Sequence, residues 1–162
     1  MRRPGGPVIL ALLALLLAAC GRGAADGAPP TVRVAVGDRT VDLKPTQYCD
    51  GSSFHRYDVE PPVIAAAPGI RIRFTVPQAV AGRGWGVQVY DQQLQKPIGN
   101  VAVPAGAVTF DQITMSDAVP SAFYLVVVEK ATSACHQLAG SWPAGFIRVE
   151  TGSTGSAAPT SG

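Results

Sequence analysis

Apolar residues alternate with polar ones along most of the central part of this 162-residue chain. The clearest example is the segment 70–76, IRIRFTV, in which every second side chain is apolar. Successive side chains of a β-strand point to opposite faces of the sheet, so a period of two predicts strands with one buried face. This pattern constrains the fold more than any other feature, and it predicts an all-β protein.

Short segments of the same kind recur along the chain, at 31–36, 40–43, 70–76, 85–90, 100–103, 108–113, 123–128 and 146–150. Proline- and glycine-rich turns separate them. Short strands punctuated in this way are typical of antiparallel sandwiches and barrels. Only 80–84 and 131–138 favour a turn of helix.

The order of the segments fits an immunoglobulin-like antiparallel β-sandwich. In that fold Trp85 would be the core tryptophan, and 31–36 and 40–43 would form an N-terminal β-hairpin extension closed by the turn at Gly37-Asp38. The strands B, C, E, F and G would be 70–76, 85–91, 108–113, 123–129 and 146–150, in that order.

Two of the three cysteines, Cys49 and Cys135, form an even pair downstream of the third, Cys20. Neither lies in a Cys-x-x-Cys motif, which disfavours a zinc site, and an even pair in an exported protein favours a disulfide. The usual B and F cysteine positions are apolar here. Cys49 precedes B and Cys135 lies in the F–G connection, so we expect the bridge to tie the hairpin extension to that connection.

The first residues have the pattern of an export signal. Arg2 and Arg3 precede a run of 12 apolar residues, 8–19, which is shorter than the roughly 20 needed to cross a bilayer. The run ends in Leu17-Ala18-Ala19-Cys20, which resembles the bacterial lipobox. This resemblance implies cleavage after residue 19, a lipid on Cys20 and a membrane anchor on the extracytoplasmic side. A plain signal peptide with a chance cysteine is the alternative.

The expected organisation is therefore a lipoprotein signal peptide at 1–19, a flexible tether at 20–30, a β-sandwich domain at 31–150 and a disordered, low-complexity tail at 151–162. Without Arg2 and Arg3, the 13 basic residues become 11, equal to the 11 acidic residues. This balance gives no argument for a nucleic-acid partner.

Three pieces of the chain carry a family resemblance: 68–77, PGIRIRFTVP; 84–91, GWGVQVYD; and the valine-rich run after Tyr124. They resemble the actinobacterial lipoproteins of domain-of-unknown-function family 2771, over most of the chain that follows Cys20. The resemblance implies a cell-envelope lipoprotein without an assigned activity. It supplies no catalytic residues.

Two histidines are the candidate metal ligands. His55 and His136 each lie near a cysteine, and a disulfide could bring the imidazoles together with Asp50 or Asp58 as a third ligand for zinc or copper. The simpler interpretation is two solvated loop histidines. Trp142, in the segment AGSWPAG, is expected in a loop, either as a lid over the core or as an exposed binding contact together with His136.

No serine lies in a Gly-x-Ser-x-Gly motif, and no phosphate-binding loop precedes a helix. The sequence therefore predicts no catalytic residues and no cofactor. It favours a lipid-anchored, non-enzymatic module that binds an envelope protein or cell-wall ligand. A metal-binding lipoprotein using His55 and His136 is the first alternative, and a hydrolase with an unrecognised site is the second.

Overall fold

The computed structural model describes residues 28–116, 119–133, 135 and 138–149. Almost all regular structure in these ranges is strand. The strands are β1 (Val32–Val36), β2 (Arg39–Leu43), β3 (Gln47–Asp50), β4 (Ser53–Arg56), β5 (Val63–Ala66), β6 (Arg71–Thr75), β7 (Trp85–Tyr90), β8 (Pro97–Ala102), β9 (Thr109–Thr114), β10 (Ala122–Glu129) and β11 (Gly140–Arg148). One helical segment, α1 (Gln78–Arg83), joins β6 to β7.

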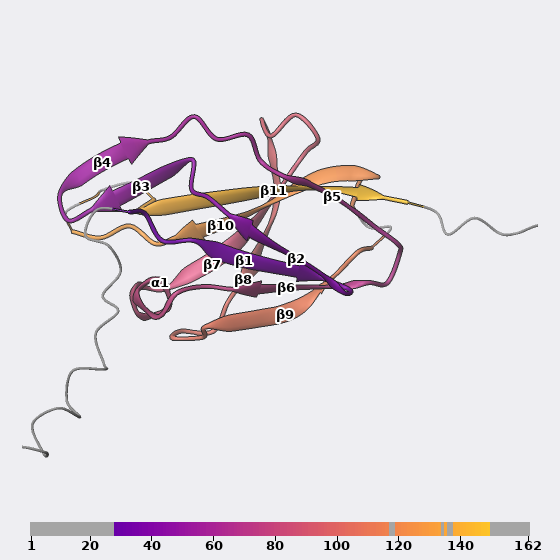
Figure 1. The fold of residues 1–162 in the computed structure, drawn as a ribbon, viewed down its shortest axis with the longest axis horizontal. Coiled ribbons are helices and arrows are strands. Elements are labelled where there is room, and N and C mark those ends of the chain that lie inside the picture. Colours follow the sequence, from indigo (N-terminus) through magenta and orange to yellow (C-terminus); the bar gives the residue numbers. More distant parts are fainter. Residues whose placement is uncertain (1–27, 117–118, 134, 136–137, 150–162) are drawn as a thin grey trace, which may run out of the picture.

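The strands form two sheets that pack as a sandwich (Figure 1). One sheet has the order β2-β1-β6-β9. The other has the order β4-β3-β11-β10-β7-β8, with β5 added along β11. All pairings are antiparallel except that of β5 with β11, which is parallel.

This topology confirms the immunoglobulin-like sandwich. The predicted B and E strands, β6 and β9, pair in the four-stranded sheet, and the predicted C, F and G strands, β7, β10 and β11, are neighbours in the other. The connections from β6 to β7 and from β9 to β10 cross from one sheet to the other, whereas β10 and β11 are neighbours in one sheet. The result is two layers with one core between them.

The predicted N-terminal hairpin is also confirmed, as β1 and β2. It does not stand apart from the sandwich, because β1 pairs with β6 and so extends the four-stranded sheet. The alternation of Val32, Val34 and Val36 explains this position, since all three side chains are buried in the shared core.

Several elements escaped the sequence analysis. The hairpin of β3 and β4 was not predicted, because the residues of β4 are all exposed and have no apolar period. Strand β11 was expected only from residue 146 but begins at Gly140. The segment 140–145 contains glycine and proline, which are normally turn residues, yet it is paired on one side with β10 along its whole length.

The core lies between the sheets, and two aromatic contacts define its ends. Trp85 is buried, as predicted, and packs edge-on against Phe110 with ring centroids 6.4 Å apart. Its indole N–H donates to the backbone oxygen of Ala107 at 2.6 Å. At the other end Phe123 and Phe146 stack at 5.6 Å. Within the described ranges no helix is long and apolar enough to cross a membrane.

Candidate functional site

Two of the predicted site residues, Cys20 and His136, lie outside the described residues, as does the whole predicted signal peptide. The lipid anchor and the shared histidine site therefore stay predictions. His55 lies in β4, where it is exposed and paired with Tyr48 across the hairpin. Among the described residues, no group of three or more histidine, cysteine or acidic side chains is arranged to hold a metal ion.

Cys49 and Cys135 lie together, with their sulfur atoms in contact as a disulfide and their Cα atoms 6.5 Å apart. Cys49 is in β3, so the bridge ties the second hairpin, not the predicted β1–β2 hairpin, to the connection between β10 and β11. The backbone N–H of Cys49 also donates to Ala139 at 2.6 Å. Both cysteines and Ala139 form a small buried cluster separate from the main core.

The structure contradicts the prediction that Trp142 is an exposed contact in a loop. It lies within β11 and is fully buried in the main core. Its indole N–H donates to the backbone oxygen of Pro30 at 2.8 Å, and its ring packs against Tyr48 at 6.1 Å. Strand pairing over 140–143 turns the side chain inward, so Trp142 is a structural residue and not a binding anchor.

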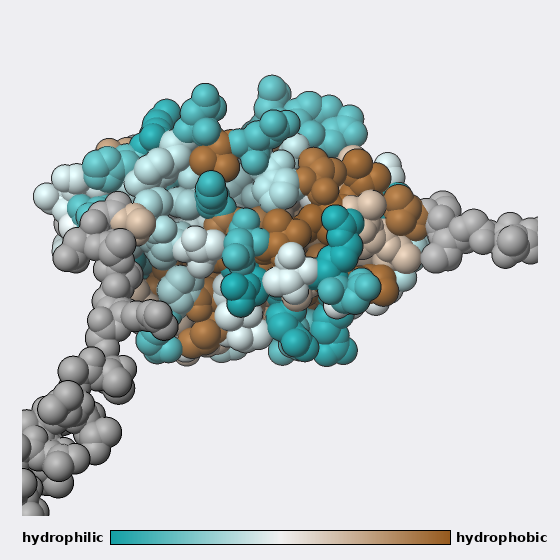
Figure 2. Space-filling model, viewed as in Figure 1, coloured by the Kyte–Doolittle hydropathy of each residue, from teal (hydrophilic) through white to brown (hydrophobic). Residues whose placement is uncertain are grey.

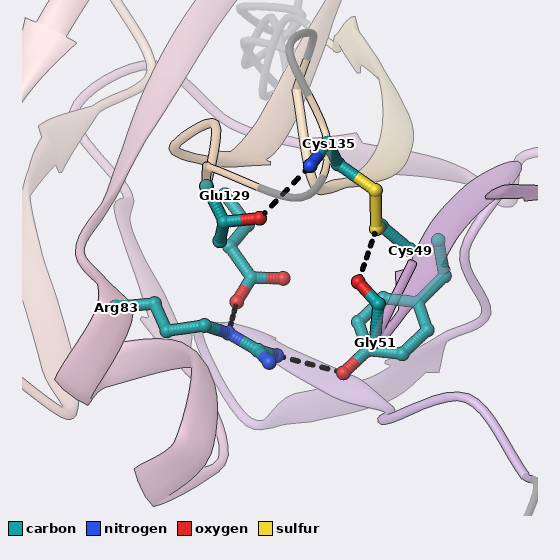
Figure 3. Close-up of polar contacts among 7 residues, drawn as sticks. Cys49, Gly51, Arg83, Glu129 and Cys135 are labelled. Carbon is teal, nitrogen blue, oxygen red and sulfur yellow. Dashed lines mark hydrogen bonds and ion pairs between the residues drawn. A yellow bond between two sulfur atoms is a disulfide. The ribbon is translucent and has the colours of Figure 1, made fainter. Parts of the chain in front are cut away.

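An ion pair that the sequence does not predict lies beside Trp142, between the buried Glu129 and Arg83, whose side chain is 36% exposed. Glu129 ends β10 with no exposed surface, and its Oε1 accepts from the Arg83 guanidinium of α1 (Figure 3). Arg83 also donates to the Tyr48 hydroxyl at 2.7 Å. A Cβ on Gly140 would lie 2.3 Å from the Trp142 ring. We call these five residues, Tyr48, Arg83, Glu129, Gly140 and Trp142, the buried corner.

Burial governs the electrostatics of the corner. Desolvation raises the pKa of Glu129, and it outweighs the opposing effect of the Arg83 hydrogen bond and charge. Desolvation opposes the charge on Arg83 as well, but its hydrogen bonds to Tyr48 and Glu129 leave its pKa raised. Glu129 Oε2 is buried and has no hydrogen-bond partner among the described residues. The carboxylate therefore connects α1 to the seven-stranded sheet through only one of its two oxygen atoms.

The buried corner is built for packing, because its carboxylate has no exposed surface through which a substrate could reach it. One sequence signal could have revealed Glu129. In the pleat of β10 it follows Leu125 and Val127, which face the core, in the same phase. No sequence signal identifies Arg83 as its partner, because their contact arises from packing of α1 on the sheet.

The outward side of three neighbouring strands of the seven-stranded sheet, β7, β10 and β11, has a distinct composition. Strands β7, β10 and β11 alternate between core-facing residues and outward ones. Within these strands all outward side chains are uncharged, and we call their surface the uncharged face. Across its register it presents Gly86, Gln88 and Tyr90 of β7, Tyr124, Val126 and Val128 of β10, and Ser141, Pro143, Gly145 and Ile147 of β11.

Three hollows open on the uncharged face. One of about 280 Å³ lies between Tyr124, Gly145, Val63 and the turn residues Gln92 and Gln93. A second, of about 210 Å³, contains Gln47, Gln88, Tyr90 and Pro143 among its lining residues. A third, of about 300 Å³, is bordered by Asn100, Val128, Leu138 and Lys130.

The opposite face of the sandwich is charged. Arg33 of β1 pairs with Asp42 of β2 at 2.9 Å, and Arg71 and Arg73 of β6 approach Asp111 of β9 at 3.5 and 3.4 Å. We call this surface of the four-stranded sheet the ion-paired face. In the view of Figure 2, hydrophilic residues are spread over the face shown, and a group of apolar residues lies at its right-hand side, over β5 and the adjoining part of β11.

That apolar area includes three of the most exposed large apolar side chains, Val63, Ile147 and Val149. Val63 and Ile147 line the 280 Å³ hollow, so this patch continues into the uncharged face. Comparisons with known proteins add no further assignment: no family model, curated protein or solved structure matches this chain.

Proposed function

We propose that this protein is a lipid-anchored, extracytoplasmic and non-enzymatic module of the cell envelope that binds its partner through the uncharged face. The observation that carries the proposal is the asymmetry of the sandwich. One face pairs its charges with one another. On the other, the outward side chains of β7, β10 and β11 carry no charge and border three hollows, of which one also has Lys130 at its edge.

The leader supports the envelope location. The run 8–19 and the sequence Leu17-Ala18-Ala19-Cys20 are typical of a lipidated export signal, and the disulfide suits an oxidising compartment. Among the described contacts, none specifically favours the metal-binding or hydrolase alternatives.

The anchor is tested in cells that express the full chain. The wild type should take up labelled fatty acid and partition with membranes, whereas Cys20→Ser should take up none. The double variant Cys49→Ser with Cys135→Ser is the control, because it removes both other cysteines without touching the lipobox and leaves neither unpaired; it should keep the label. Equal labelling of the wild type and Cys20→Ser would contradict lipidation at Cys20.

The binding face is tested with a photo-crosslinking amino acid in intact cells. We expect adducts when it replaces Gln92, beside the 280 Å³ hollow, and none when it replaces Arg73 on the ion-paired face. Both positions are exposed, so the replacements should leave the fold intact. Adducts from Arg73 alone, or from neither position, would place the binding surface elsewhere.

A further inference from the structure

The chemistry of the uncharged face also indicates a ligand class. We infer that the face binds a neutral polysaccharide, whose uncharged sugar rings lie along β10 and β11 across the two hollows that contain Tyr124 and Tyr90. This inference rests on the proposed function, since it specifies the ligand of the same surface.

The two hollows adjoin each other. Tyr124 and Tyr90 are direct register partners on β10 and β7, and Gly145 and Pro143 are two residues apart on β11. Tyr124 and Gly145 line one hollow, and Tyr90 and Pro143 line the other. A chain ligand that follows β10 and β11 therefore passes through both hollows in succession.

Gly145 shapes the floor beneath Tyr124. A Cβ at this position would lie 3.0 Å from Cε1 of the Tyr124 ring, so the ring rests against the backbone where a side chain would otherwise stand. Aromatic faces carry partial negative charge and attract the weakly positive C–H groups of a ligand. A tyrosine ring lying on the sheet is thus a suitable platform for a sugar ring.

Amide and hydroxyl side chains surround this platform. Gln92 and Gln93 line the first hollow, and Gln47, Gln88, Thr46 and Ser141 line the second. Each amide offers donors and an acceptor, and each hydroxyl is both a donor and an acceptor. Sugar hydroxyls have the same dual character, so uncharged side chains of this kind match them without a counter-charge.

The composition of the two linings disfavours a charged ligand. A polyanion needs basic side chains, and the linings of these two hollows contain none. Tyrosine is also an anchor residue at protein interfaces, and the exposed Val63 and Ile147 line the first hollow, so a protein partner is separated from a polysaccharide by the experiment.

The experiment is affinity electrophoresis of the full chain in a non-ionic detergent, through gels containing galactan, arabinan, mannan or an unbranched glucan, with polygalacturonate as the charged comparison. We expect at least one neutral polysaccharide to retard the protein. Retardation should not change when the salt concentration is raised, because no ion pair is involved.

Variants connect binding to the face. Tyr124→Ala should weaken binding by at least about tenfold. Because Tyr124 is partly buried, the exposed double variant Gln92→Ala with Gln93→Ala provides an independent test, and it should weaken binding severalfold with an unchanged Tm. Arg73→Ala on the ion-paired face is the control and should bind like the wild type.

The outcomes separate this inference from the proposed function. No retardation by any neutral polysaccharide, together with protein adducts at Gln92 in cells, would overturn the polysaccharide and keep the binding face. Salt-sensitive binding to polygalacturonate alone would also overturn it. Neutral binding that survives both face variants would overturn the placement of the ligand.

Discussion

The buried corner and the ion-paired face use the same kinds of side chain in opposite settings. In the corner, Glu129 has no exposed surface and contacts Arg83 of α1. On the face, the side chains of Arg33 and Asp42 are 61% and 56% exposed. Removing one partner of a buried pair leaves a charge without water, whereas water replaces a lost partner at the surface. A carboxylate therefore matters to stability according to its place in the fold.

The largest expected effect comes from breaking the buried pair. Arg83→Met keeps an unbranched apolar side chain but leaves the buried Glu129 unpaired. Because Arg83 is itself 36% exposed, the loss of stability near neutral pH should be at most the roughly 3–5 kcal/mol of a fully buried pair. Denaturant unfolding measures this loss. Arg33→Met is the matched control on the ion-paired face, and an equal loss in both variants would erase the distinction between the two settings.

Removal of the disulfide beside the corner should cause the next largest loss of stability. Its cysteines are 86 positions apart, so the bridge restricts a long loop of the unfolded chain. Replacing both Cys49 and Cys135 with serine should cost about 2–5 kcal/mol. The wild type unfolded with and without a reducing agent provides the comparison. An unchanged unfolding midpoint after complete reduction would show that the disulfide does not stabilise the β3–β4 hairpin.

Gly140→Ala tests how tightly the corner is packed. The added methyl group would lie 2.3 Å and 2.6 Å from two carbons of the Trp142 ring, which is itself fully buried. Overpacking of this kind should cost about 1–3 kcal/mol. Gly82→Ala, where an added Cβ meets nothing within 4 Å, is the control and should not lower Tm. Equal Tm values for the wild type and Gly140→Ala would mean that the corner is loosely packed.

The Glu129→Gln variant tests the buried carboxylate through the pH dependence of the protein's stability. The folded-state pKa of Glu129 is raised, mainly by desolvation, so folding favours its protonated form. This contribution to stability is fully present below the unfolded pKa of about 4.3 and is lost as pH rises through the higher folded pKa. The glutamine variant should lack that decline, and a Tm series across pH would show a flatter profile. Parallel profiles for the two proteins would contradict the raised pKa.

The smallest effect is expected on the ion-paired face. Asp42→Asn removes the partner of Arg33 at a site where both side chains are well exposed. Solvent screening and the freedom of exposed side chains limit the value of such a pair. Its Tm should not differ measurably from that of the wild type at moderate salt. A loss of stability comparable with that of Arg83→Met would mean that solvent exposure does not determine how much these ion pairs contribute to stability.

The sequence determined the fold class because the core-facing residues obey a local rule. The alternation in 70–76 and 85–90, the apolar run at 123–128 and the buried Trp85 all follow from a strand whose neighbouring side chains face opposite ways. The order of these segments was sufficient to identify the B, C, E, F and G strands. The pairing of Cys49 with Cys135 followed instead from the even number of cysteines after Cys20.

The tertiary structure alone decided the surroundings of Trp142, the partner of Glu129 and the uncharged face. Glycine and proline around Trp142 indicate a loop, but pairing with β10 holds the segment in a strand and buries the indole. Arg83 and Tyr48 meet only because α1 packs beside β3. Side chains from strands far apart in the sequence share a face only once their strands pair, and the period within one strand does not identify its partner strand.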